Sequence, residues 1–224
     1  KVHSFNSVEN TTLEKKVYNE LLNGIISGKL LPGTQVTIME LAEQLGVSLM
    51  PVRQALKALE AKNLIHIQKN RRFLIRELSI ADLQELFDIR IDLELMAIKE
   101  AAEICEEEDI INLETIFQDM KEAGKIEEYL QKNRIFHHTI YKIAEKPILF
   151  EIIEDLWFRV SPYMSLYLVR ENVKYHDHFH EKIFQALKKK NPKEAARWLK
   201  LHLEKSLEEL TIQLLERQAS EIHA

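Results

Sequence analysis

The amino-acid sequence predicts a mainly α-helical protein, with an N-terminal winged helix-turn-helix over residues 1–77 and a C-terminal all-α antiparallel helical bundle over residues 78–224. Two short amphipathic segments near the start are joined by a tight glycine-containing turn, and two short β-type segments follow them. The rest of the chain shows helical apolar periodicity, short connections and very little glycine or proline.

The elements of the first part can be placed by their end signals. Apolar residues recur at helical spacing from Leu13 to Ile26, and Gly28 ends this first helix. Thr37 is expected to cap a short second helix over residues 38–45, which Gly46 ends in the left-handed conformation. A third helix is expected from the N-cap Ser48 to about residue 62.

A basic hairpin is predicted directly after the third helix. Residues 64–68 and 73–76 have the β-branched and apolar character of short strands, and the connection at 69–72 contains three cations. A helix-turn-helix with such a hairpin is a winged helix. Its third helix enters the major groove of DNA, and the wing reaches the backbone or the adjacent minor groove.

The bundle is expected to contain six helices, over residues 79–105, 108–122, 125–145, 147–169, 173–189 and 192–222. Ser79 and Asp109 occupy positions typical of N-caps, and Pro147 and Pro192 occupy first turns, where a missing N–H costs nothing. The connections are short, so neighbouring helices are expected to be antiparallel.

Composition limits the function classes. The 224 residues have a net charge of −5, divided into +4 for residues 1–77 and −9 for the remainder, so a polyanion is expected to contact only the first part. A single cysteine, Cys105, excludes an intramolecular disulfide framework and a cysteine-built zinc site. There is no long apolar run and no export signal, and we therefore expect a cytoplasmic protein without membrane contact.

Three segments resemble the N-terminal domain of GntR-type bacterial transcription regulators. These are "IISGKLLPGTQVT", "ELAEQLGVSLMPVRQALKALEAKNLI" and the wing "KNRRFLI". The resemblance and the helix-turn-helix pattern predict contacts with double-stranded DNA from Thr37, Ser48, Met50, Arg53, Gln54, Lys57, Lys69, Arg71 and Arg72.

Within this set Arg53 is the strongest candidate for a base or phosphate contact. Gln54 replaces the usual acid and can pair with adenine, whereas Met50 can contact a thymine methyl. Leu49 stands where the family usually has a cation, which predicts an operator different from the commonest ones. The alternative for the cations, above all for Lys57, is a solvated helix face.

Histidines in the bundle have spacings that suit a metal site. Asn133 and His137 lie four residues apart on one helix face, and His180 and His202 are separated by two helices and a turn. Three imidazoles that converge in a bundle can bind zinc or another divalent transition metal. Histidines that belong only to the core or the surface are the alternative.

The second part resembles the FadR-type C-terminal ligand-binding domain, the FCD domain, in "FDIRIDLELMAIKEAA", "NRIFH" and "HEKIFQAL". The resemblance implies metal ligands at His137, His180, His202 and position 133, where the usual Asp is Asn133 here. The expected metal is zinc, with nickel or manganese as alternatives. A neutral amide is a poorer ligand than a carboxylate, and a metal-free pocket whose histidines bind the ligand directly is a second possibility.

The same resemblance implies a small carboxylate effector bound by Arg90, Glu94 and Arg159. A structural Arg90–Glu94 ion pair and a surface position for Arg159 are the alternatives. His176 and His178 are expected to be solvated.

The predicted function is a ligand-responsive transcription regulator, a repressor, that binds a palindromic operator as a homodimer and is not an enzyme. The rival functions are a small histidine-ligated metallohydrolase and a helical interaction module. The sequence contains no HExxH, P-loop, nucleophile elbow or dinucleotide-binding glycine pattern. A metallohydrolase also leaves the first third unexplained, and an interaction module would have an incidental helix-turn-helix.

Overall fold

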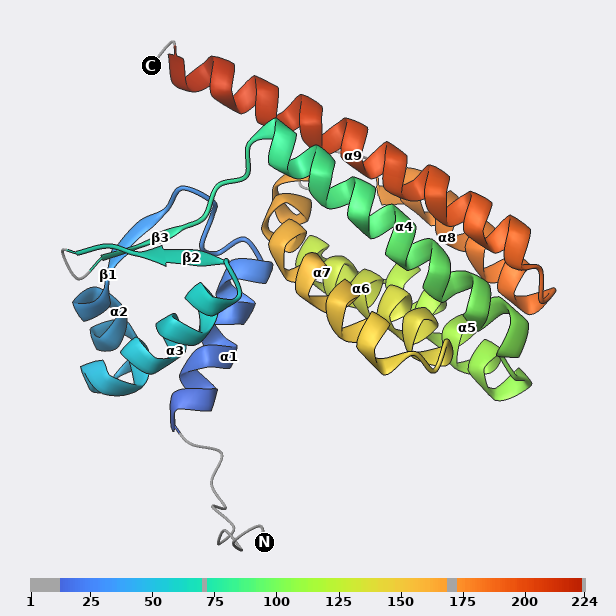
Figure 1. Ribbon diagram of the computed structural model, residues 1–224, viewed down its shortest axis with the longest axis horizontal. Coiled ribbons are helices and arrows are strands. Elements are labelled where there is room, and N and C mark those ends of the chain that lie inside the picture. Colours follow the sequence, from blue (N-terminus) through green and yellow to red (C-terminus); the bar gives the residue numbers. More distant parts are fainter. Residues whose placement is uncertain (1–12, 70–71, 169–172, 223–224) are drawn as a thin grey trace, which may run out of the picture. The chain divides into compact units, whose positions relative to one another are not determined.

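The computed structural model describes residues 13–69, 72–168 and 173–222 (Figure 1). The chain divides into two compact units, Lys1–Glu77 and Leu78–Ala224. The first unit contains helices and a small three-stranded sheet where two strands were predicted, and the described part of the second unit contains helices alone, as predicted. None of the described helices combines the length and the apolar character needed to cross a bilayer.

The first unit is a winged helix-turn-helix. Its elements are α1 (Leu13–Ile26), β1 (Gln35–Thr37), α2 (Ile38–Leu45), α3 (Leu49–Ala61), β2 (Ile65–Ile67) and β3 (Arg72–Ile75). The strands form an antiparallel sheet of order β1-β3-β2. Strand β1 was not predicted, because three residues show no readable alternation and its pairing partner β3 lies more than 30 residues away in the chain.

Local signals explain the helix-turn-helix. The Thr37 hydroxyl accepts a hydrogen bond from the Glu40 amide, and the Glu40 carboxylate accepts one from the Thr37 amide, which is a complete capping box for α2. Gly46 ends α2 in the left-handed region, with a φ of 63°. The apolar face of α3 is then fully buried through Val52, Leu56 and Leu59.

The second unit is a helical bundle. Its helices are α4 (Ile80–Ile104), α5 (Glu107–Lys121), α6 (Ile126–Ile143), α7 (Pro147–Leu168), α8 (Val173–Lys188) and α9 (Pro192–Ile222). Helix α9 lies alongside α4 and α8, and the bundle core is formed by residues of all six helices. Ser79 caps α4 as predicted. Asp109 does not cap α5, because Glu106 is the N-cap and Asp109 accepts a hydrogen bond from its amide.

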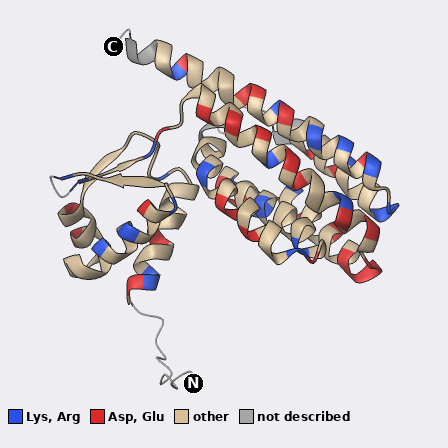
Figure 2. Cartoon of the chain, viewed as in Figure 1, with Lys and Arg blue, Asp and Glu red and all other residues tan. Residues whose placement is uncertain are grey.

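Charge follows this division, as Figure 2 shows. Many Asp and Glu positions, red in Figure 2, lie along α4 and α5, in keeping with the net charge of −9 beyond residue 77. In the first unit, α3 contains Arg53 and Lys57, and β3 begins with Arg72. The net negative charge of the bundle does not favour contact with a polyanion.

Candidate functional site: an exposed recognition helix and a buried histidine centre

Helix α3 presents a polar face to solvent. Met50, Arg53, Gln54 and Lys57 are exposed, opposite the buried apolar face of the same helix. Because the tight turn at Gly46 places α3 directly after α2, this face has the geometry of a recognition helix. Ser48 is the N-cap residue of α3 and is exposed, and its hydroxyl makes no capping hydrogen bond.

The other predicted DNA contacts lie in different settings. The Thr37 hydroxyl is engaged in the α2 capping box, so this side chain stabilises the helix-turn-helix itself. Lys69 is exposed two residues after β2, and the Arg72 guanidinium is exposed beside the Gln35 amide oxygen at 3.4 Å. Arg71 lies outside the described residues.

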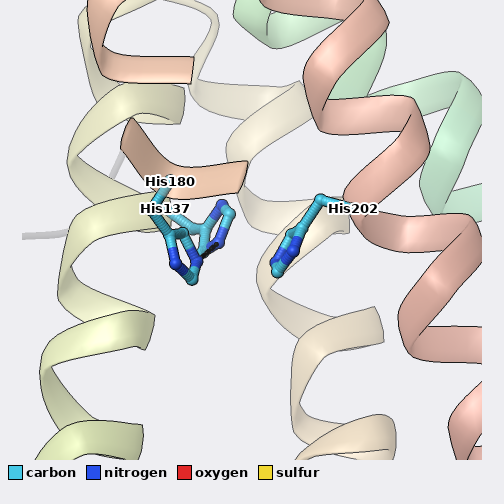
Figure 3. Close-up of side chains that lie close together, drawn as sticks. All are labelled: His137, His180 and His202. Carbon is cyan, nitrogen blue, oxygen red and sulfur yellow. Dashed lines mark hydrogen bonds between the residues drawn. The ribbon is translucent and has the colours of Figure 1, made fainter. Parts of the chain in front are cut away.

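The three predicted histidine ligands come together inside the bundle (Figure 3). His137 on α6, His180 on α8 and His202 on α9 are at most 4% exposed, and one nitrogen of each lies within 4.8 Å of the others. The Nε2 atoms of His137 and His180 are 3.1 Å apart. Helical spacing and an antiparallel α8–α9 hairpin produce this convergence.

These imidazoles are held neutral. Burial lowers the pKa of His137, His180 and His202 well below the usual value of 6.5, and neighbouring imidazoles lower it further. A neutral imidazole has one lone pair in the ring plane, which is the form that binds metal ions. The cluster therefore has three ligand atoms in the correct protonation state.

Asn133 supplies a further sign that the centre accepts another group. Its side chain is 3% exposed, one turn before His137 on α6, and its Oδ1 atom has no hydrogen-bond partner. The Nδ1 atom of His202 is also buried without a partner. Buried oxygen atoms without partners cost free energy, so an ion or a polar ligand at this place relieves the penalty. Three imidazoles and an amide oxygen fit a divalent transition metal.

A chain of polar contacts joins the centre to α4. The Arg90 Nε atom lies 2.7 Å from the Glu94 Oε1 atom, and both side chains are almost fully buried. The Tyr141 hydroxyl donates to the other Glu94 oxygen and lies 3.4 Å from His137 Nδ1. Both carboxylate oxygens of Glu94 are therefore occupied, so this residue holds Arg90 and Tyr141 in place.

Trp157 on α7 is a residue of this site that sequence reasoning missed. Its ring lies 4.8 Å from the Arg90 guanidinium carbon and 5.6 Å from the His137 ring centroid. The indole Nε1 atom is buried and has no hydrogen-bond partner. Arg159, two residues later, is partly buried, and its Nε atom also lacks a partner. The apolar periodicity of the sequence does not distinguish a tryptophan of the site from a tryptophan of the core, so Trp157 could not be assigned in advance.

The expectation for His176 was wrong. This side chain is 3% exposed, its ring contacts His202, and its Nε2 atom lies 3.2 Å from the Glu209 carboxylate. His176 precedes His180 by one helical turn, and that spacing was the available signal. His178 is exposed, as expected.

A winged helix-turn-helix joined to a bundle with a buried histidine centre defines a two-domain transcription regulator. The profile described as bacterial regulatory proteins, gntR family, matches residues 13–75, and that of the FCD domain matches residues 85–205, more than half of the chain. The chain belongs to the GntR family and carries an FCD domain.

Individual relatives agree with this assignment. The chain is 35% identical over 158 residues to the HTH-type transcriptional regulator McbR of Escherichia coli (strain K12), covering 69% of this chain and 72% of McbR. It is 29% identical over 189 residues to the gluconate operon transcriptional repressor of Bacillus subtilis, covering 79% and 76%. The solved structure of E. coli McbR/YncC superposes with a TM-score of 0.84 at 30% identity, covering 92% of this chain and all of that one.

The predicted family, fold class and function class, a ligand-responsive transcription regulator, are therefore confirmed. The relatives named here are regulators of transcription.

Proposed function

We propose that this regulator binds a two-fold related operator as a homodimer and represses transcription until a small carboxylate metabolite binds beside the histidine centre. The observation that carries the proposal is the convergence of three buried neutral imidazoles next to the buried Arg90, in a chain that also presents a recognition helix. A site of this composition can bind a carboxylate through the Arg90 guanidinium and a metal ion.

The DNA-binding part of the proposal rests on α3 and the wing. Arg53, Gln54 and Met50 would read base edges, and Lys57, Lys69 and Arg72 would contact phosphates. Ser48 and Thr37, near the starts of α3 and α2, and Arg71 in the wing complete the proposed contacts. Cytoplasmic localisation belongs to this proposal, because operator DNA lies there.

The metal-binding part rests on the ligand set. His137, His180, His202 and Asn133 would hold the ion, and zinc is the proposed metal, with nickel or manganese as alternatives. A bound ion supplies positive charge that attracts a carboxylate. Because Asn133 brings no charge, the site would bind metal less tightly than one with Asp at this position.

Effector recognition would use Arg90 and Trp157. The Arg90 guanidinium lies between the Phe87 and Trp157 rings, 4.8 Å from each centroid, and Glu94 binds its Nε atom. A carboxylate would bind the remaining N–H groups, and the unpaired indole N–H of Trp157 offers one further donor. The unpaired Nε of Arg159 makes that residue a secondary candidate. Binding would favour one arrangement of the regulator over another and so change operator affinity.

Dimerisation would use an apolar groove of about 650 Å³ formed by α4 and the start of α7. Met96 and Ile148 line it and are 56% and 75% exposed, and a Lys146–Glu100 ion pair of 3.5 Å lies at the same place. Large exposed apolar side chains in one groove are typical of protein interfaces. A second copy of the chain is the partner that a two-fold operator requires.

Fluorescence anisotropy with the DNA upstream of the protein's own gene tests the proposal. Protein stripped with chelator, and the same protein reloaded with zinc, would be titrated into labelled operator and into scrambled DNA. Selective, salt-sensitive binding is expected, and one member of a panel of mono-, di- and tricarboxylates should release the DNA at low concentration. Equal affinity for both DNAs would rule out operator recognition. Selective binding that no carboxylate changes would rule out the proposed effector class.

A further inference from the structure

Tyr141 lies one helical turn after His137 on α6 and is 1% exposed. Its hydroxyl donates a hydrogen bond to Glu94, whose other oxygen pairs with the Arg90 guanidinium. A carboxylate in an ion pair only accepts hydrogen bonds, so the single Tyr141 proton points at Glu94. The lone pairs of the same hydroxyl oxygen remain for His137 Nδ1 at 3.4 Å, the long end of the range for a hydrogen bond.

The hydrogen-bond geometry makes this arrangement one-directional. The hydrogen bond to Glu94 uses the single phenol proton, so the Tyr141 oxygen has only lone pairs left for His137. Because the Tyr141 oxygen can only accept from His137, the imidazole hydrogen belongs on Nδ1.

We propose that Tyr141 is a positioning residue that fixes His137 in its Nδ1–H tautomer and so directs the Nε2 lone pair into the histidine centre. Nε2 is the atom that faces His180, at 3.1 Å. Tyr141 contacts no ion itself, and it acts through His137, with Glu94 and Arg90 holding its hydroxyl. The inference rests on the proposed metal-binding function of the centre. Ligand histidines in metal sites are commonly oriented in this way by a hydrogen bond to their other nitrogen.

A pair of tyrosine variants separates positioning from packing. Tyr141→Phe removes the hydroxyl beside His137. Tyr129→Phe is the matched control, because Tyr129 is also buried on α6 and its hydroxyl donates to a carboxylate, that of Asp177, at 3.1 Å. Zinc affinity of the full chain would be measured by competition with a chromophoric chelator. The expected loss is about 10- to 100-fold for Tyr141→Phe and less than about threefold for Tyr129→Phe. Equal affinities for the two variants overturn the proposal.

A second measurement needs no metal. Long-range ¹H–¹⁵N correlation spectra of the chelator-treated wild-type protein report which nitrogen of each imidazole carries hydrogen, and His137→Gln assigns the His137 signals. The Nδ1–H pattern is expected for His137 in wild type, and a mixed or reversed pattern in Tyr141→Phe. An Nε2–H pattern in the wild type overturns the proposal.

The two measurements fail for different reasons. If wild-type protein binds no zinc while His137 shows the Nδ1–H tautomer, the metal-binding function is refuted and the tautomer assignment stands. If zinc binds with His137 in the opposite tautomer before loading, the metal-binding function stands and the role of Tyr141 is refuted.

Discussion

Acidification of the metal-free protein should destabilise the bundle through His138, and the size of this effect follows from the structure. His138 lies between the Phe150 and Trp157 rings and is 8% exposed. Burial, with a contribution from Arg134, lowers the pKa of His138 to about 3 from the ordinary 6.5. Below pH 6.5 the His138 imidazole therefore binds a proton in the unfolded chain, whereas in the folded chain it stays neutral down to about pH 3.

The stability that comes from the neutral, buried His138 is therefore fully present above pH 6.5 and is lost as the pH falls towards 3. Between pH 7 and pH 5 the unfolded imidazole becomes almost fully protonated, whereas the folded one stays neutral. The difference contributes about 2 kcal/mol to the free energy of unfolding from this one residue. The three histidines of the centre act in the same direction, whereas Glu209, whose pKa burial raises to about 7, acts in the opposite direction.

A variant isolates the His138 contribution. His138→Leu keeps an apolar side chain between the two rings and removes the titrating group. Urea unfolding at pH 7 and pH 5, with chelator present, would be followed by tryptophan fluorescence, since both tryptophans, Trp157 and Trp198, lie in the bundle. The fall in the free energy of unfolding between the two pH values should be smaller by about 2 kcal/mol in His138→Leu than in wild type.

The control is His178→Leu, which removes an exposed imidazole from the same domain and should leave the pH dependence at its wild-type size. If His138→Leu loses as much stability as wild type on going from pH 7 to pH 5, His138 is not held neutral by burial.

Three further predictions concern the metal, the dimer and the operator. Asn133→Asp should raise zinc affinity, measured by chelator competition, about tenfold or more. It should also lower the stability of the metal-free protein, because the buried carboxylate lacks a partner. Unchanged zinc affinity would place residue 133 outside the ligand set. Ile148→Glu should give monomers in light scattering. The control Ile111→Glu replaces another isoleucine, 59% exposed on α5, and should remain dimeric. Dimers from both variants would exclude the α4–α7 groove as the dimer interface. Arg53→Ala should weaken operator binding by about 1–3 kcal/mol. Arg197→Ala makes the same charge change on α9 and should leave operator affinity unchanged. Similar losses in both variants would show that operator affinity depends only on net charge.

The sequence predicted those features that depend on nearby residues. Thr37 and Ser79 start helices and Gly46 ends one, because capping chemistry acts within about four residues. The convergence of His180 and His202 could be predicted because a short connection forces α8 and α9 to be antiparallel, which brings distant positions on facing helices together.

Features that depend on three-dimensional packing could not be predicted. Strand β1 exists only because β3 pairs with it, and the buried position of Trp157 between Arg90 and His137 depends on how α7 packs against α4 and α6. Tyr141 has the i+4 spacing from His137 that would allow contact, but the sequence does not reveal that its hydroxyl bridges Glu94 on another helix.

Charge explains why a dimer matters for the proposed function. The described cations on α3 and the wing that face solvent are Arg53, Lys57, Lys69 and Arg72, so one DNA-binding unit has few groups with which to neutralise phosphates. If each contacts one phosphate, the logarithm of affinity falls with the logarithm of salt at a slope of about −4, and two units on one operator give about −7. The larger slope also implies much tighter binding at low salt. A monomeric Ile148→Glu protein would therefore lose affinity and about half of its salt dependence together, without any change in the recognition helix.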